Sequence, residues 1–322
     1  MTDANAADHR TPKLQLAIET TGRCGSIAIL RGQEVLQATN LPETTRTAAS
    51  LAVYLDDILS RHRDGSRPIE LVSVADGPGS FTGLRIGVTT AKSLCYALKV
   101  PLVAVDSLAA VATAIFHDNI EAQSVCVGLD AYRQQVFAGC FRRTELLGSP
   151  DRLPPNWTPH PPQVKVLSVS QWNAFLSGLG QSNAPSDRSP DRFGSLSGFD
   201  SANQSVSPIG ESPLRSSPNS LPGSLNPPNP LNQPNPLNQP SSLNQPSSLN
   251  PVSVGEQWFA AGDEKPFQQS RLTMLGRKCD AIGVGLLAAR AYRLGLSTDP
   301  LALIPRYLKP SAAEEKAQQD QG

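Results

Sequence analysis

The sequence predicts an α/β protein that opens with a mixed sheet and has helices packed against that sheet. Three short apolar segments, at residues 14–18, 26–30 and 34–38, follow one another and are separated by turn-forming residues. This pattern is typical of a three-stranded meander. Helical and strand-like segments then alternate as far as residue 115. A meander followed by such an alternation predicts a mixed sheet covered by helices.

The alternating part of the chain predicts three helices and two strands. Apolar residues recur at helical spacing over 48–59 and again over 84–98. Short apolar runs at 71–75 and 102–105 predict buried strands. Ser107 follows the second of these strands, and we expect it to cap the third helix.

Weaker signals predict a second domain in the remainder of the chain. Strands are expected at 124–129 and 135–142, and a strand at 164–169 leads into a helix that begins near Ser170. A clear apolar stripe predicts a final helix over 280–294.

Between these signals, residues 180–250 consist mainly of Ser, Pro, Asn, Gln and Gly. Leucine recurs every six residues from Leu225 to Leu249, but each unit carries a proline, which removes a donor from any sheet. The composition therefore predicts disorder and not a β-helix of six-residue repeats. The predicted divisions are a tail at 1–12, an N-terminal lobe at 13–118, a C-terminal lobe at 119–179 and 251–310, the disordered insertion at 180–250, and a tail at 311–322.

The charge balance and the apolar runs restrict the class of protein. Lysine plus arginine equals aspartate plus glutamate at 28 each, whereas proteins that hold RNA by its phosphates normally carry a basic excess. We therefore expect a partner to hold any RNA. The first residues lack the apolar core of a signal peptide, and no apolar run approaches about 18 residues, so we expect a soluble cytoplasmic protein.

The cysteines show no CxxC spacing and lie mostly in apolar runs, which predicts reduced, buried thiols. They are Cys24, Cys95, Cys126, Cys140 and Cys279.

The glycine-rich segment at 75–87 is the strongest candidate for a binding site in the sequence. A strand, a glycine turn and a helix in succession leave backbone N–H groups and the positive end of the helix directed at one place, which suits an anion. In the alternative interpretation the glycines only allow a tight connection, and the sequence leaves both open. The spacing fits neither the dinucleotide fingerprint nor a P-loop, and Ser80 is not the centre of a GxSxG elbow. The predicted anion or nucleotide site comprises Gly77, Gly79, Ser80, Thr82, Gly83 and Arg85.

The sequence gives little support for a metal site or for a catalytic site. The four histidines, His9, His62, His117 and His160, form no HxxxH or HExxH pair, and we expect them at the surface. The acidic residues that qualify as general acids or bases are Glu19, Asp76, Asp106 and Asp130, of which Asp106 and Asp130 are equally well explained as capping or turn residues. We therefore predict no metal site and no catalytic set.

The helix that begins near Thr82 predicts a partner surface. At about 100° per residue, its apolar arc is the core face, which comprises Leu84, Gly87, Val88, Ala91, Leu94, Cys95 and Leu98. The opposite arc is uncharged and mostly small, and comprises Ile86, Thr89, Thr90, Ser93, Tyr96 and Ala97. Small uncharged residues allow another helix to approach closely, so we expect a helix of a partner here. The alternative is that another element of the same chain covers this arc.

Four segments together resemble one known family. GPGSFTGLRIG and the following TTAKSLCYALKVPLVAVDSLAAV, the opening LAIETTGRCGSIAIL and the final PRYLKPSAAEEK look like the TsaB family, the dimerisation subunits of the machinery that makes tRNA threonylcarbamoyladenosine. The resemblance implies a two-lobed actin-like ATPase or ribonuclease H-like fold, with mixed five-stranded sheets flanked by helices. The insertion would then interrupt the second lobe.

The same resemblance implies a scaffold that is not an enzyme on its own. TsaB-like proteins pair through their N-terminal helices with a TsaD-like catalytic subunit, and a TsaE-like ATPase docks on the assembly. The partner would transfer threonylcarbamoyl to tRNA, the chain would meet tRNA only through the complex, and a homodimer is an option when the chain is alone. No firmly bound cofactor is implied, with ATP or ADP at the partner interface as the candidate. Glu19 stands where nucleotide-handling relatives place an aspartate, which argues against ATP hydrolysis.

Two other functions remain open at this point. One is a glycoprotease-like, metallopeptidase-like peptidase, although the sequence offers no nucleophile, base and orienting residue together. The other is a stand-alone nucleotide-binding module that uses the turn from Gly77 to Arg85.

Overall fold

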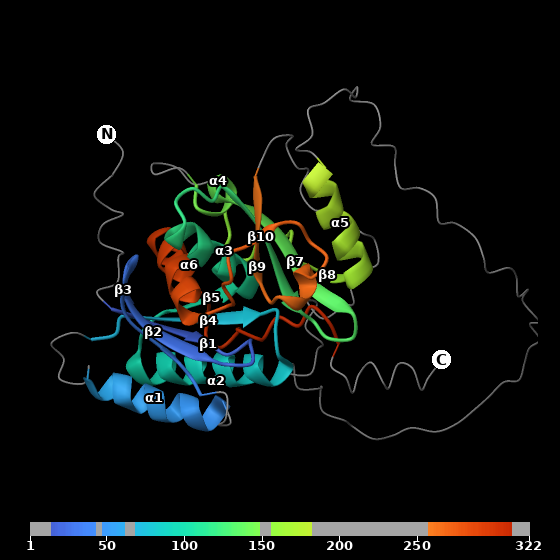
Figure 1. The fold of residues 1–322 in the computed structure, drawn as a ribbon. Coiled ribbons are helices and arrows are strands. Elements are labelled where there is room, and N and C mark those ends of the chain that lie inside the picture. The colour runs from blue at the N-terminus through green and yellow to red at the C-terminus, as the bar shows by residue number, and fades with distance from the viewer. Residues whose placement is uncertain (1–13, 43–46, 62–67, 149–155, 182–256, 311–322) are drawn as a thin grey trace, which may run out of the picture. The chain divides into compact units, whose positions relative to one another are not determined.

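Two five-stranded sheets form the framework of the protein in a computed structural model that describes residues 14–42, 47–61, 68–148, 156–181 and 257–310 (Figure 1). All of these residues belong to one unit of the chain. Both predicted tails lie outside the described residues, and so do His9, His62 and all but the first two residues of the predicted insertion.

The first sheet combines an antiparallel start with parallel additions. β1 (Gln15–Glu19), β2 (Ser26–Arg31) and β3 (Glu34–Asn40) pair antiparallel, as the meander predicted. β4 (Leu71–Gly77) pairs parallel with β1, and β5 (Leu102–Asp106) pairs parallel with β4. The resulting order is β3-β2-β1-β4-β5, so the predicted mixed sheet is confirmed.

The second sheet repeats this topology. β6 (Ser124–Asp130), β7 (Gln135–Arg142) and β8 (Lys165–Ser168) form the antiparallel part. β9 (Trp258–Gly262) pairs parallel with β6, and β10 (Thr273–Met274) pairs parallel with β9. The order β8-β7-β6-β9-β10 therefore matches that of the first sheet strand for strand.

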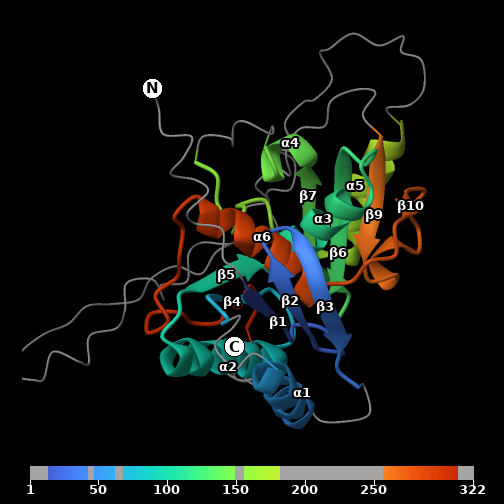
Figure 2. The ribbon, with the colours of Figure 1, turned by 90° about the vertical axis from the view of Figure 1, so that its left-hand side faces the viewer.

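Helices lie on both faces of each sheet. They are α1 (Thr47–Arg61), α2 (Phe81–Leu98), α3 (Ser107–Asp118), the short α4 (Arg143–Leu146), α5 (Val169–Gln181), the 3-10 turn η4 (Lys265–Phe267) and α6 (Ala281–Arg293). α1 and α2 cover one face of the first sheet, and α6 covers the other (Figure 2). α3 packs against α6 and against the second sheet, whose opposite face is covered by α5. α3 and α6, which pack against each other between the two sheets, thus join the two lobes.

The alternation of side chains along β1 shows why the first sheet needs a helix layer on each side. Leu16 and Ile18 belong to the cluster under α1 and α2, whereas Ala17 belongs to the cluster around α3 and α6. Successive residues of a strand point to opposite faces, so a strand that is buried at every position needs a covering layer on both faces. All five residues of β1 are buried.

The cap of α3 differs from the sequence prediction. Asp106 is the N-cap, and its Oδ1 accepts a hydrogen bond from the amide of Ala109 at 2.8 Å. Ser107 is the first residue of the helix instead. Asp106 keeps the extended backbone of β5, which is the conformation that a capping residue needs.

Parts of two predicted apolar stripes are also exposed. Ala48 and Ala52 of α1 are exposed, as is Leu98, and Leu94 is only half-buried. α1 is an outer helix whose buried face is narrow, and Leu98 is the last residue of α2 before Lys99 turns the chain with φ of 55°.

The strands β9 and β10, which follow the insertion, were not predicted from the sequence at all.

Candidate functional site

The carboxyl ends of β4 and β5 meet a loop of the C-terminal lobe. Asp76 is buried there, and both of its carboxylate oxygens lie 3.0 Å from Nε2 of His160. The carbonyl of Pro159 accepts a hydrogen bond from the amide of Asp106 at 3.1 Å, so the loop is held at both strand ends. The expectation that His160 is a surface residue was therefore wrong, because this loop folds back onto the first sheet. His117, by contrast, is exposed as predicted.

Asp106 is the second buried acid of this site. Its side chain is fully buried and forms an ion pair with Arg306, a residue of the segment that follows α6. Burial raises the pKa of Asp106, while the charge of Arg306 and the bond from Ala109 act in the opposite direction. Asp106 thus caps α3 and anchors Arg306.

The glycine turn connects β4 with α2. Ser80 caps α2, because its Oγ accepts a hydrogen bond from the amide of Gly83 at 3.3 Å. The amide of Ser80 is used as well, since it donates to the carbonyl of Thr21 at 2.8 Å. Two of the N–H groups that could face an anion therefore already have partners within the chain.

Three glycines of this turn allow other backbone to approach. A Cβ at Gly83 would lie 1.8 Å from the carbonyl oxygen of Thr20, and a Cβ at Gly79 would lie 2.5 Å from Cβ of Thr21. Gly77 has φ of +135°, and a Cβ there would lie 2.4 Å from the carbonyl oxygen of Arg306. These contacts favour the structural interpretation of the glycines, although an anion site beside them stays a prediction.

A pocket of about 320 Å³ lies between the glycine turn and the turn that joins β6 to β7. Of the predicted anion-binding residues, Gly79, Ser80 and Thr82 line it, whereas Gly77, Gly83 and Arg85 do not. The opposite wall is the turn from Asp130 to Arg133, and the C-terminal segment 306–310 adds Arg306, Tyr307 and Lys309 to the lining. Arg133, Arg306 and Lys309 bring positive charge to this pocket, which suits an anionic group.

Arg85 lies on aromatic rings rather than in the pocket. Its guanidinium carbon is 4.2 Å from the centre of the Phe81 ring, and its Nε donates to the hydroxyl of Tyr307 at 3.2 Å. The sequence placed Arg85 near any bound phosphate, and the structure places it against Phe81 and Tyr307. Arg85 therefore does not line the pocket itself, although its two partners, Phe81 and Tyr307, do.

Glu19 closes the turn between β1 and β2 with its own side chain. Its Oε1 accepts hydrogen bonds from the amide and the hydroxyl of Thr21, the latter at 2.5 Å, and from the amide of Gly22 at 3.2 Å. Its Oε2 is buried and has no hydrogen-bond partner among the described residues. Burial raises the pKa of Glu19 to about 7, against the lowering effect of the Thr21 and Gly22 bonds.

We predict that Glu19→Gln removes a pH dependence of stability. Because the pKa is 4.5 when the group is solvated and about 7 when folded, the folded state binds this proton more tightly. Wild-type protein should therefore lose roughly 2–3 kcal/mol of unfolding free energy between pH 5 and pH 8 through this group alone. Glutamine keeps an oxygen for the three donors and carries no charge. The unfolding free energy of the Glu19→Gln protein should exceed that of wild type. The difference should grow as the pH rises to about 7 and stay constant above that pH.

Chemical denaturation at pH 5, 6, 7 and 8 measures this difference. Glu34→Gln is the matched control, because Glu34 is an exposed glutamate on β3 paired only with Arg31 among the ion pairs described. Its curve should run parallel to that of wild type. Parallel curves for Glu19→Gln and wild type would contradict the raised pKa.

None of the five cysteines, all of which lie in described residues, forms a disulfide, which agrees with the prediction of reduced thiols. Cys95, Cys126 and Cys140 are buried, and burial raises the pKa of Cys95 to about 12. Cys24 and Cys279 are only half-buried, because both lie in loops at strand or helix ends, so the prediction of full burial was wrong for these two.

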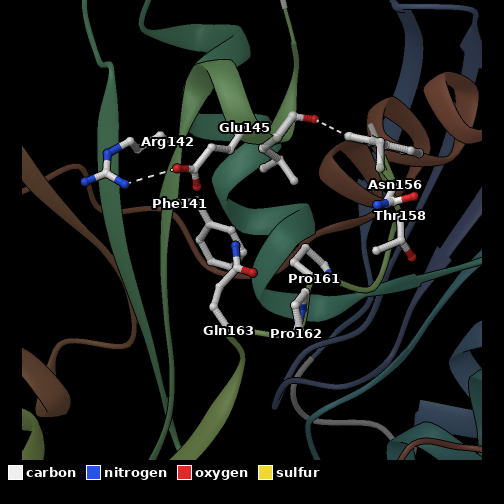
Figure 3. Close-up of a pocket in the computed structure, with 10 residues that line it drawn as sticks. Phe141, Arg142, Glu145, Asn156, Thr158, Pro161, Pro162 and Gln163 are labelled. Atoms are coloured by element: carbon white, nitrogen blue, oxygen red, sulfur yellow. Dashed lines mark hydrogen bonds and ion pairs between the residues drawn. The ribbon is translucent and has the colours of Figure 1, made fainter. Parts of the chain in front are cut away.

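A second, smaller pocket of about 140 Å³ lies beside β7 and α4 (Figure 3). Two bonds join groups of its lining: Nε1 of Trp157 donates to the carbonyl of Leu146 at 2.7 Å, and Arg142 donates to Glu145 at 3.0 Å. Pro161 and Pro162 form part of the lining as well.

Within the described ranges, no group of three or more His, Cys, Asp or Glu side chains is placed to hold a metal ion. None of the helices in this part of the chain is both long and apolar enough to cross a bilayer.

The predicted partner surface lies on the outer side of α2. Thr89, Ser93, Tyr96 and Ala97 are exposed, Tyr96 at 86%, while Ile86 and Thr90 are half-buried. The two charged side chains of α2 lie beside this arc and bind other parts of the chain: Lys92 donates to the carbonyl of Leu303 at 2.9 Å, and Arg85 lies on the ring of Phe81. The exposed arc is thus uncharged.

The repeated sheets and their helix layers define a two-lobed α/β protein with two mixed five-stranded sheets flanked by helices, as the resemblance implied. The chain is similar over 92% of its length to a Pseudomonas aeruginosa protein described as similar to the peptidase YeaZ, with a TM-score of 0.56, 18% identity and 99% of that chain covered. YeaZ from Pseudomonas aeruginosa gives a TM-score of 0.52 at 17% identity, covering 92% of this chain and 99% of that one. At these identities the likeness concerns the fold.

Sequence comparison identifies the family that the chain resembles. A family model described as TsaD, tRNA N6-adenosine threonylcarbamoyltransferase, matches residues 42–151. The tRNA threonylcarbamoyladenosine biosynthesis protein TsaB of Bacillus subtilis is 37% identical over 131 residues, which are 39% of this chain and 54% of that protein. TsaB of Haemophilus influenzae is 30% identical over 122 residues, 38% of this chain and 51% of that protein. The matches span about half the length of these relatives, and the resemblance to the TsaB family is confirmed.

Proposed function

We propose that this chain is the dimerisation and scaffold subunit of a complex that makes N6-threonylcarbamoyladenosine in tRNA, and that it pairs with a TsaD-like catalytic subunit in the cytoplasm. One observation carries the proposal: the segment that matches the family model, residues 42–151, includes α2 and its exposed, uncharged arc. An exposed helix face without charge is suited to another helix, which can approach small side chains closely.

We further propose that the chain is not catalytic on its own. The buried acids at the carboxyl ends of β1, β4 and β5 already have partners: Asp76 lies against His160, Asp106 caps α3 and binds Arg306, and Glu19 caps its own turn. The sequence offers no nucleophile together with a base and an orienting residue, so we do not favour the peptidase alternative. The overall charge of zero fits a subunit that meets tRNA only through its partner.

Further partners and ligands extend the proposal. A TsaE-like ATPase would dock on the pair, and the chain would form a homodimer through the same arc when the partner is absent. ATP or ADP at the partner interface would use the pocket that Gly79, Ser80 and Thr82 line, where cationic side chains from the C-terminal segment provide the charge complement.

We expect the purified chain neither to hydrolyse peptides nor to transfer threonylcarbamoyl to tRNA, because its buried acids are committed to structural bonds. Addition of a TsaD-like subunit, a TsaE-like ATPase and threonylcarbamoyl adenylate should give modified tRNA, measured by mass spectrometry of digested nucleosides. Reactions that lack one subunit at a time are the controls. Robust transfer by the chain alone would refute the scaffold proposal, and full activity of the other two subunits without this chain would refute its place in the complex.

A further inference from the structure

The segment that follows α6 returns to the N-terminal lobe. It lines the pocket between the glycine turn and the turn that joins β6 to β7, and we call this space between the two lobes the cleft. The amide of Thr298 donates to the carbonyl of Leu102 at 2.7 Å, at the free edge of the first sheet. Leu303 is buried in the cluster under α1 and α2. The next residues, Arg306 to Lys309, lie across the carboxyl ends of β4 and β5.

Arg306 fastens this segment to the N-terminal lobe by three bonds. Its amide donates to the carbonyl of Asp76 at 2.7 Å, its Nη2 donates to the carbonyl of Gly77 at 2.8 Å, and its guanidinium pairs with the carboxylate of Asp106. The ring of Tyr307 adds a fourth contact, because it stacks on Phe81 with 4.4 Å between the ring centres.

Lys309 fastens the same segment to the C-terminal lobe. Its Nζ donates to the carbonyl of Ala131 at 2.9 Å and to Oε1 of Gln135 at 3.0 Å, both in the turn between β6 and β7. Four consecutive residues therefore connect the strand ends of one sheet with the first turn of the other.

The backbone of the N-terminal lobe is shaped to accept this segment. Gly77 has φ of +135° and would place a Cβ 2.4 Å from the carbonyl oxygen of Arg306, so a larger residue would displace the segment. In open α/β sheets, the crevice outside the carboxyl ends of the strands is where ligands bind. Here Arg306 and His160 of the same chain occupy it.

We propose that the C-terminal segment Arg306–Lys309 is a latch that holds the two lobes at one angle without a bound ligand. α3 and α6 join the lobes along one side, and the latch closes the cleft on the side where the carboxyl ends of β4 and β5 lie. This proposal concerns the chain itself and holds whether or not the proposed partner is correct.

Lys309→Ala in the full chain tests the latch, because it removes the bonds to the C-terminal lobe and leaves the Arg306–Asp106 pair intact. The measurement is hydrogen exchange of backbone amides. The informative group is the amide of Asp106, which bonds to Pro159 across the cleft and does not contact Lys309. We expect this amide and those of the turn from Ala131 to Gln135 to exchange about tenfold faster than in wild type, since opening of the cleft exposes both.

Lys265→Ala is the matched control. Lys265 also binds the turn between β6 and β7, with Nζ 3.0 Å from Asp130, but it comes from the same lobe as that turn. Its removal should leave exchange at Asp106 unchanged. A purely local role of Lys309 would give faster exchange in the turn alone and would overturn the latch, as would no change in either place.

A second variant releases the other end of the latch. Arg306→Ala combined with Asp106→Asn removes the guanidinium without leaving a buried carboxylate unpaired. We expect faster exchange in the turn from Ala131 to Gln135, far from either substitution in sequence, with amides of β1 and β6 still protected. If those strands also lose protection, the variant is unfolded and the Lys309→Ala result decides. A protected turn in a folded variant would contradict the proposal.

Discussion

Thr89→Arg combined with Ser93→Arg is expected to abolish pairing of this chain with a TsaD-like subunit, and its self-association, while the fold persists. Both residues are exposed on α2, one helical turn apart. Two long cations in a closely packed helix seam would lose water without gaining partners, and an unpaired buried charge typically costs several kcal/mol. Light scattering and co-purification measure the pairing, and circular dichroism and thermal melting monitor the fold.

The same charge placed elsewhere provides the control. Ala174→Arg combined with Ser177→Arg adds two arginines to exposed positions of α5, on the outer face of the second lobe. This variant should pair as wild type does. If the α2 variant unfolds, the arc packs inside the chain; if it is folded and still pairs, the interface lies elsewhere. The side of α1 with Ala49, Val53 and Ser60, all exposed, is then the next candidate.

Local periodicity was sufficient to predict most of the first lobe. The strands of the meander and the apolar stripes of α1 and α2 depend on neighbours within one element, so the sequence carries their signal directly. β9 and β10 were missed for the opposite reason. β9 has only five residues and is placed by pairing with β6 across the insertion, and β10 has only two residues and is placed by pairing with β9.

The cleft was harder to predict than the elements that surround it. Asp76 was a candidate acid and His160 an expected surface histidine, and nothing in the sequence indicates that these two residues, which are 84 positions apart, meet. The same holds for Asp106 and Arg306, which are 200 positions apart. The one local signal was PRYLKP, which the resemblance to the TsaB family included, but a motif does not reveal which lobe its arginine and its lysine contact.

The role of the glycine turn could not be decided from the sequence either. A spacing of GxGxxxG is compatible with an anion site and with tight packing, because both require backbone without side chains. The structure separates the positions: Gly79 lines the pocket, whereas Gly83 lies under the carbonyl of Thr20. The two interpretations therefore make different predictions for Gly83.

Gly83→Ala is expected to destabilise the protein by about 3 kcal/mol, as overpacking of a well-packed core does. The added Cβ would lie 1.8 Å from the carbonyl oxygen and 3.0 Å from the carbonyl carbon of Thr20, and backbone cannot rotate away as a side chain does. The carbonyl of Gly83 also accepts a hydrogen bond from Oγ1 of Thr20 at 2.7 Å, so a shift of α2 would lengthen this bond. Chemical denaturation measures the unfolding free energy.

Gly178→Ala is the matched control, because Gly178 is an exposed residue of α5 with no heavy atom within 4 Å of its added Cβ. Alanine is favoured over glycine inside a helix, so this variant should gain roughly 0.5–1 kcal/mol. The two substitutions add the same methyl group to two helices, and only the space around it differs. If Gly83→Ala also leaves the unfolding free energy near that of wild type, the close approach of Thr20 is not what requires glycine. Weakened ATP binding in such a stable variant would then favour the anion interpretation of the turn.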